Sequence, residues 1–200
     1  MTSQAAPTPS RTDSQRPGYR ESSPAEVESD ADWKGDHMTL TADERERLIQ
    51  QYATAPARLR AAVAAVPPAA MQWRPTPTEF SAHEVVCHCA DSETNAAVRI
   101  RYLIAEKDPV IVGYDPANWA SRFDYHSHPL EAALAAVDAV RANTAALIRR
   151  LPDAAWQNAG THTESGRYTA SHWLKIYSEH LEEHIEQIDR TIEAWRASVR

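Results

Sequence analysis

Glycine, phenylalanine and cysteine are scarce in this chain of 200 residues, which contains only five, two and two of them. Alanine is abundant instead, and because alanine loses no side-chain entropy in a helix, this composition favours helices over strands. The two cysteines, Cys87 and Cys89, would point about 200° apart on a helix and could not form a disulfide there. This use of cysteine fits a reducing compartment, so we expect a cytoplasmic protein.

Long basic segments and long apolar segments are missing as well. No block of Lys or Arg occurs, and the net charge of −7 at pH 7 argues against nucleic-acid binding. No apolar run approaches the roughly 18 residues that a transmembrane helix needs, and the N-terminal segment lacks the apolar centre of a signal peptide. We therefore expect neither nucleic acid nor a membrane as a partner.

The chain divides into a polar leader and one domain. Residues 1–37 are rich in Ser, Pro, Asp and Glu and contain few apolar side chains. Such a segment cannot bury enough apolar surface to offset its loss of conformational entropy, so it is predicted to be a disordered leader. Met38 follows directly and offers an alternative start of translation. Residues 38–200 are long enough for a single hydrophobic core and are predicted to form one domain.

Two capping-box sequences mark the start of the first two predicted helices. Thr41 with Glu44 opens a periodic run over residues 40–66, and Ser81 with Glu84 opens another over residues 81–106. The first run contains Pro56, which can kink a helix. The apolar stripes predicted to face the core are Leu48, Tyr52, Leu59, Val63 and Val66 in the first helix, and Val85, Cys89, Ala96, Ile100 and Leu103 in the second.

Two further helices are predicted over residues 129–151 and 169–195. Their apolar stripes are Leu134, Val137, Val140 and Leu147 in the third helix, and Trp173, Ile176, Tyr177, Leu181, Ile185 and Ile188 in the fourth. Residues 152–167 are predicted to be a loop, and no segment alternates for long enough to predict a strand. Four amphipathic helices of this length predict an all-α protein with a four-helix bundle.

The longest predicted loop, residues 107–128, joins the second and third helices. It is longer than a bundle turn requires, so it predicts one long crossover. The loop is rich in aromatic residues, among them Tyr114, Trp119 and Phe123. These three side chains are candidates for the wall of a substrate pocket, and packing over the edge of the core is the alternative.

Three of the nine histidines lie where helix geometry can bring them together. His180 and His184 are spaced i, i+4, so they lie on one face of the fourth helix about one turn apart. At about 100° per residue both flank the apolar stripe of that helix, as His88 flanks the stripe of the second. Flanking positions on neighbouring helices can meet, so the three imidazoles are candidate ligands of a divalent metal ion. Separate, solvated polar side chains are the alternative.

Carboxylates lie close to these histidines in the sequence. Glu84 and Asp91 are each about one helical turn from His88, and Glu183 is about one turn from His180. A carboxylate placed in this way can orient a metal-bound imidazole or act as a general base. A solvated acidic helix face is the alternative for most of the glutamates near His180.

Two segments around these histidines resemble the DinB-like superfamily of metal-binding four-helix bundles. Residues 81–93, SAHEVVCHCADSE, are similar to the family pattern in the second helix, and residues 180–188, HLEEHIEQI, are similar to the H-x-x-x-H pattern in the fourth. The segment LPDAAW at residues 151–156 is similar to another recurrent segment. The resemblance covers about residues 40–195. It implies a divalent ion, zinc or nickel, bound by His88, His180 and His184 with further positions open to water.

This resemblance leaves three functions open. The family includes S-transferases that use bacillithiol or mycothiol, proteins assigned as metal-dependent hydrolases, and members without a known activity. We therefore expect a transferase with a low-molecular-weight thiol as cofactor, a hydrolase that activates a bound water, or a metal-stabilised binding or stress-response module without turnover. Either enzyme would act on a small-molecule substrate, and the extensive apolar helix surface is compatible with a homodimer.

Overall fold

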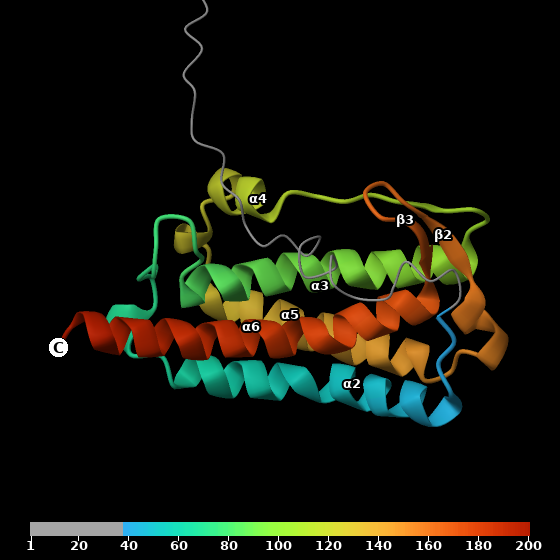
Figure 1. The fold of residues 1–200 in the computed structure, drawn as a ribbon, viewed down its shortest axis with the longest axis horizontal. Coiled ribbons are helices and arrows are strands. Elements are labelled where there is room, and N and C mark those ends of the chain that lie inside the picture. The colour runs from blue at the N-terminus through green and yellow to red at the C-terminus, as the bar shows by residue number, and fades with distance from the viewer. Residues whose placement is uncertain (1–37) are drawn as a thin grey trace, which may run out of the picture.

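The computed structural model describes residues 38–200, and the leader predicted for residues 1–37 lies outside this part of the chain. Four long helices form a bundle: α2 (Ala42–Ala64), α3 (Ala82–Ala105), α5 (Leu130–Ile148) and α6 (Ala170–Ser198) (Figure 1). The predicted four-helix bundle is therefore confirmed. Within residues 38–200, no helix has both the length and the hydropathy to cross a bilayer.

The N-caps show how the sequence starts these helices. Thr41, Ser81 and Thr169 each accept a hydrogen bond from the backbone N–H three residues later, and the side chain at that position contacts the backbone N–H of the cap in return. The first two capping boxes match the prediction. The third uses His172 where a Glu or Gln is usual, so its sequence does not resemble a capping box.

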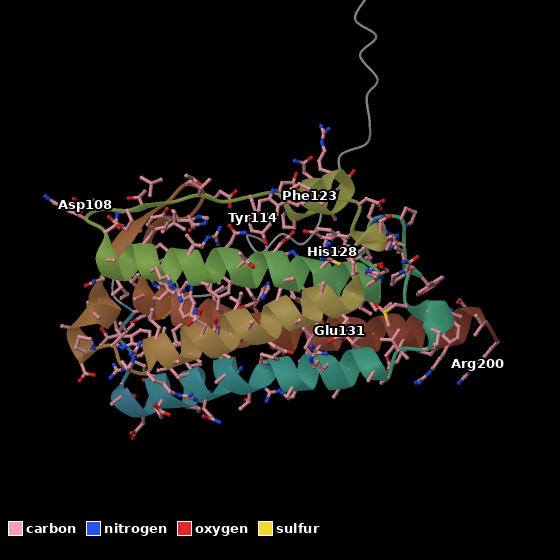
Figure 2. The ribbon with its side chains drawn as sticks, turned by 180° about the vertical axis from the view of Figure 1, so that it is seen from behind. Asp108, Tyr114, Phe123, His128, Glu131 and Arg200 are labelled. Carbon is pink, nitrogen blue, oxygen red and sulfur yellow. The ribbon has the colours of Figure 1, made fainter. Side chains whose placement is uncertain are left out.

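The four bundle helices do not follow an up-and-down order in which each helix packs antiparallel to the next one in the chain. Both α2 and α3 pack beside α5 and α6, so α2 and α3 lie at opposite corners of the bundle (Figure 1). Because α3 and α5 run in the same direction, the chain must return along the bundle between them. Residues 106–129 make this return over the outer side of α3, and Figure 2 labels Asp108 and His128 near the two ends of this crossover.

The connections are more regular than the sequence predicts. The crossover contains β1 (Val110–Ile111), α4 (Pro116–Arg122) and a 3-10 turn (Tyr125–Ser127). Residues 152–167, predicted to be a loop, contain a 3-10 turn (Asp153–Gln157) and most of the hairpin of β2 (Ala159–His162) and β3 (Gly166–Thr169). β1 pairs with β2 in parallel, which gives the sheet order β1-β2-β3. The absence of strands was therefore a wrong prediction, because segments of two to four residues are too short to show an alternating pattern.

The core of the bundle consists of two apolar clusters with polar side chains between them. One cluster joins the C-terminal halves of α2 and α6 to the N-terminal halves of α3 and α5, and the other joins the opposite halves. We call the buried polar residues between the clusters the polar belt. Its members are His88, Glu93, Arg141, Thr144 and His180, with the partly buried His184 beside them.

The polar belt changes which face of α5 is buried. The predicted stripes of α2 and α3 are buried at every position, but Val140 and Leu147 of α5 are only partly buried. Arg141 and Thr144 are fully buried instead. The stripe predicted for α5 is therefore wrong in part, because polar residues occupy the core positions that hydrophobicity alone assigns to their neighbours.

Candidate metal centre

The polar belt brings the three predicted histidines together. His88 comes from α3 and His180 and His184 come from α6, and their candidate ligand atoms all lie within 4.8 Å of one another. The Nε2 atoms of His180 and His184 are 3.2 Å apart. The ring of His88 is roughly perpendicular to both, with centroid distances of 5.6 Å to His180 and 4.8 Å to His184. His88 and the pair His180 and His184 thus form one cluster, although they are more than 90 positions apart in the sequence.

His180 and His184 each form a hydrogen bond through Nδ1, and these bonds leave their Nε2 atoms facing one another. Nδ1 of His180 donates to Oε1 of Glu93 at 3.0 Å, because an ionised carboxylate only accepts. Nδ1 of His184 lies 2.9 Å from the amide oxygen of Gln187 and donates to it. In a neutral imidazole the second nitrogen then carries a lone pair. When both imidazoles are neutral, the two Nε2 atoms face each other with lone pairs and without a proton between them.

This convergence of lone pairs fits a cation. Two imidazole nitrogens bound to one zinc ion at about 2.0–2.1 Å are about 3.3 Å apart at a tetrahedral angle. The observed separation of 3.2 Å is close to this distance. Nδ1 of His88 is buried and has no hydrogen-bond partner within residues 38–200, so no bond at that atom opposes rotation of the ring. The three side chains therefore fit a divalent transition-metal ion.

Burial favours the neutral form of His88 and His184. Loss of solvent around His184, with a smaller effect of the neighbouring His180, lowers the pKa of His184 to about 3. Burial likewise holds the pKa of His88 well below its usual value, and both other imidazoles add to the effect. Neutral imidazole is the form that binds metal ions, so little competition from protons is expected at neutral pH.

A buried ion pair stands behind His180. Arg141 donates from Nε and Nη2 to both carboxylate oxygens of Glu93 at 2.7 and 2.6 Å, and neither side chain is exposed. The same guanidinium donates to the carbonyl oxygens of Tyr52 and Tyr177 at 2.9 and 2.7 Å. Arg141 therefore links α5 to the other three helices. Burial disfavours the charged form of Glu93, but Arg141 and His180 outweigh it and hold the pKa of Glu93 below its usual value.

Pro56 explains why one of these carbonyl groups needs a partner. In a regular helix the oxygen of Tyr52 accepts from the N–H of the residue four positions later, which here is Pro56. Since proline has no N–H, Arg141 donates to this oxygen instead, and its guanidinium also lies 3.9 Å from the centroid of the Tyr52 ring. The proline in α2 and the arginine in α5 thus form one structural unit.

Within residues 38–200, the carboxylates predicted to support the histidines form no hydrogen bond to His88, His180 or His184. Glu84 forms an ion pair with Arg74 and takes part in the N-terminal capping box of α3. Asp91 accepts a hydrogen bond from the hydroxyl of Tyr125 at 2.5 Å. Glu183 is exposed and makes no hydrogen bond to an imidazole within residues 38–200. The carboxylate that does contact a histidine of the cluster is Glu93, which sequence reasoning missed.

A signal for Glu93 exists in the sequence. It lies between Cys89 and Ala96 at helical spacing, so a charge interrupts the apolar stripe of α3. Arg141 interrupts the core face of α5 four residues after Val137 in the same way. Opposite charges at core positions of two helices indicate a buried pair, because a single buried charge is costly.

The two cysteines beside His88 provide no reactive thiol. Burial raises the pKa of the Cys87 thiol to about 12 and that of the Cys89 thiol well above its usual value. Cys87 instead donates to the backbone oxygen of Tyr125 at 3.6 Å. Both cysteines therefore serve as packing residues of α3, and any thiol in the chemistry must come from outside the chain.

The three aromatic residues proposed as pocket walls differ in position. Tyr114 stacks on Trp119 with 4.4 Å between ring centroids, and Trp119 contacts Phe123 at 5.5 Å. Trp119 packs against the apolar core, whereas Phe123 is 59% exposed. Figure 2 shows Tyr114 and Phe123 on the crossover above α3. Burial raises the pKa of Tyr114 and the nearby Ser92, one turn after His88, opposes this shift, so Tyr114 is the member that lies next to the histidine face of α3.

Comparison with known proteins agrees with this architecture. Residues 51–188 match the profile of the DinB superfamily. The chain belongs to the DinB superfamily. A relative from Bacillus licheniformis is 32% identical over 155 residues, which cover 74% of this chain and 86% of the relative. A relative from Oceanobacillus iheyensis is 32% identical over 109 residues, which cover 54% of this chain and, at 63%, just under two thirds of the relative.

Both of these DinB relatives carry the provisional name of metal-dependent hydrolase. Among solved structures, YfiT from Bacillus subtilis matches with a TM-score of 0.73 and 24% identity, over 78% of this chain and 89% of YfiT. YfiT is described, also provisionally, as a metal-dependent hydrolase with an unusual four-helix bundle topology. At this identity the similarity establishes a common fold, including the arrangement of helices described above.

Proposed function

We propose that this DinB-superfamily protein binds zinc or nickel through His88, His180 and His184 and transfers a low-molecular-weight thiol to a small electrophilic substrate. The observation that carries the proposal is the 3.2 Å separation of the Nε2 atoms of His180 and His184 beside a third buried imidazole. Zinc and nickel both accept imidazole ligands. A bound divalent ion supplies a Lewis-acid centre that lowers the pKa of a coordinated thiol or water.

The residues of the chain hold and orient this centre. Glu93 and Gln187 fix the tautomers of His180 and His184, so that both Nε2 atoms point toward the same position. Three protein ligands leave one position of a four-coordinate ion open to a ligand from solution. In the transfer, the thiol first releases its proton to solvent, and its sulfur then forms a bond to the electrophilic atom of the substrate as the leaving group departs with the electron pair of the broken bond.

The positions of two carboxylates favour a thiol over water as the nucleophile. Glu84 and Asp91, which were predicted as general bases, are engaged with Arg74 and Tyr125. A thiol can be activated by the metal without a protein base, since its pKa lies much closer to neutrality than that of water. The second candidate is metal-dependent hydrolysis, which the names of the curated relatives favour.

Metal content and thiol binding test this proposal. Elemental analysis of purified protein is expected to give about one divalent ion per chain, and His184→Ala should lose most of it because two imidazoles bind far more weakly than three. His128→Ala is the matched control, since this exposed histidine lies outside the cluster and should keep its metal. Unchanged metal content in His184→Ala would show that the three-histidine site is wrong.

Cobalt-substituted protein separates the candidate reactions. Titration with cysteine or glutathione should produce a sulfur-to-cobalt charge-transfer band, together with conjugation of an electrophile such as chlorodinitrobenzene. Hydrolysis of p-nitrophenyl esters without any thiol band would favour the hydrolase. Metal binding with neither activity would indicate a metal-stabilised module without turnover.

A further inference from the structure

A polar strip runs along α3 from the candidate metal centre to Arg99. Arg99 follows His88 by eleven residues, which at 100° and 1.5 Å per residue places it within about 20° of the same face and about 16 Å along the axis. Ser92 lies on this face between them. The crossover covers the strip, because the carbonyl of Val112 accepts from Nη2 of Arg99 at 2.8 Å and Tyr114 lies beside Ser92.

Arg99 is a partly buried cation whose partners are all neutral. Nη1 donates to the hydroxyl of Tyr177 at 2.8 Å, and Nη2 donates to the backbone oxygen of Val112. Within residues 38–200 no carboxylate forms an ion pair with Arg99. Six other arginines do form such pairs: Arg45, Arg58, Arg60, Arg74, Arg141 and Arg190. The side chains of Tyr177, Tyr168 and Tyr114 lie near Arg99 instead.

This environment is suited to an anion. A guanidinium has five N–H donors in a planar fork that matches a carboxylate, and the described partners of Arg99 use two of them. A cation that has lost part of its hydration without gaining a counter-ion recovers the most free energy from an incoming negative charge.

Tyr177 connects this position to the candidate metal centre. Its hydroxyl accepts from Arg99, and its ring lies edge-on to the ring of His180 with 5.8 Å between centroids. Its backbone oxygen accepts from Arg141 of the polar belt. Tyr177 is therefore held at its backbone oxygen and at its hydroxyl, and its ring lies between the imidazole cluster and the guanidinium.

We propose that Arg99, with Tyr177 and Tyr114, binds a carboxylate of the molecule whose reacting end lies at the three histidines. This inference rests on the proposed function. The distance along α3 requires an elongated ligand, with its carboxylate on the order of 10–16 Å from the metal-binding end. Short carboxylic acids cannot span this distance. The carboxylate belongs either to the thiol or to the electrophilic substrate, and the test has an arm for each.

The first arm measures binding of thiols to the cobalt-substituted protein. The probes are 11-mercaptoundecanoate and 3-mercaptopropionate, each compared with the mercapto-alcohol of the same length. We expect the long carboxylate to bind about tenfold or more tighter than the long alcohol, and the short pair to differ little. Arg99→Gln should abolish this preference and Arg99→Lys should retain part of it, because Lys keeps the charge but not the fork.

Arg101→Gln is the matched control. Arg101 is on the opposite side of α3, about 220° from His88, and donates to the backbone oxygen of Ala97 on its own helix. Its replacement should leave the preference for the long carboxylate unchanged. Circular dichroism checks that each variant is folded. If Arg99→Gln does not fold, the preference for the long carboxylate is compared between the wild-type protein and Arg99→Lys with thiols of both chain lengths.

The second arm measures kcat/KM for long ω-bromocarboxylates and ω-bromo-alcohols with 2-mercaptoethanol as the thiol. A carboxylate preference in the first arm assigns the anion to the thiol, and a preference in the second assigns it to the electrophile. Equal binding and turnover of acids and alcohols in both arms, or a preference that survives Arg99→Gln, would overturn this inference alone. Absence of a charge-transfer band with every thiol would overturn the proposed function and this inference with it.

Discussion

Replacement of Arg141 with Met would remove the cation at the centre of the polar belt and keep a side chain of similar length. In the wild-type protein Arg141 donates two hydrogen bonds to Glu93 and one each to the carbonyl groups of Tyr52 and Tyr177. The variant therefore leaves a buried carboxylate without its cation. It also leaves the Tyr52 oxygen without a donor, because Pro56 cannot supply one.

The size of the effect follows from these two losses. Removal of one partner from a buried ion pair costs about 3–5 kcal/mol. An unsatisfied buried carbonyl group adds about 1–3 kcal/mol. The sum, about 4–8 kcal/mol, is a large part of the roughly 5–15 kcal/mol by which a domain of this size is stable. We expect Arg141→Met to be barely folded at neutral pH.

Urea denaturation of the metal-free protein, followed by circular dichroism near pH 8 and near pH 5, measures this cost. In the wild-type protein the folded-state pKa of Glu93 is lowered, so its contribution is complete above the unfolded-state pKa of about 4.3 and is lost as the pH falls below it. In Arg141→Met burial acts alone and raises that pKa. The destabilisation should then be smallest at low pH and should grow as the pH rises above about 4.3.

The difference in stability between wild-type protein and variant should therefore shrink on going from pH 8 to pH 5. A second variant, Glu93→Gln combined with Arg141→Met, removes the stranded charge and should be more stable at pH 8 than Arg141→Met alone. A cost below about 1 kcal/mol, the value of an exposed ion pair, or a cost that does not depend on pH would refute the reasoning.

Three further predictions follow from the same structure. Metal-free protein should melt at a lower temperature as the pH falls from about 7 to about 5. Burial lowers the pKa values of His88 and His184 in the folded protein, so the unfolded chain binds more protons in this range. A melting temperature that does not change with pH would contradict this. Zinc added to metal-free protein should raise the melting temperature, and the rise should be lost in His184→Ala. Gly160→Ala should destabilise the protein by about 1–3 kcal/mol, since its Cβ would lie 2.4 Å from the backbone oxygen of Pro109. Gly113→Ala is the control, because its Cβ would meet only the flexible end of Glu164. Equal urea midpoints for the two variants would refute the close approach at Gly160.

Local signals predicted much of the bundle. The capping boxes at Thr41 and Ser81 and the apolar stripes of α2 and α3 depend on residues three and four positions apart, which the sequence displays directly. The spacing of His180 and His184 belongs to the same class of signal. Their meeting with His88 was inferred from flanking positions on two helices, and the structure brings all three together.

Features that depend on contacts between distant segments were missed. Glu93 supports His180 because Arg141, 48 residues away in the sequence, neutralises it, and neither residue alone distinguishes this arrangement from an exposed charge. The strands were missed for a related reason, since β1 exists only through its pairing with β2 some 50 residues later. Glu84 and Asp91 were favoured as supporting carboxylates because they are close to His88 in the sequence. The packing of the helices instead places Glu93 against a histidine of the cluster.

The arrangement of the helices determines when the three histidines can first meet during synthesis. Among the four bundle helices of residues 38–200, no consecutive pair forms an antiparallel hairpin, because α2 and α3 occupy opposite corners, as do α5 and α6. Early segments therefore lack a local partner, and the high sequence separation of the contacts predicts slower folding than in an up-and-down bundle of equal size. His180 and His184 lie in the C-terminal helix, so a nascent chain cannot assemble the site until α6 has left the ribosome. A metal ion held by all three histidines would therefore report that the bundle is complete.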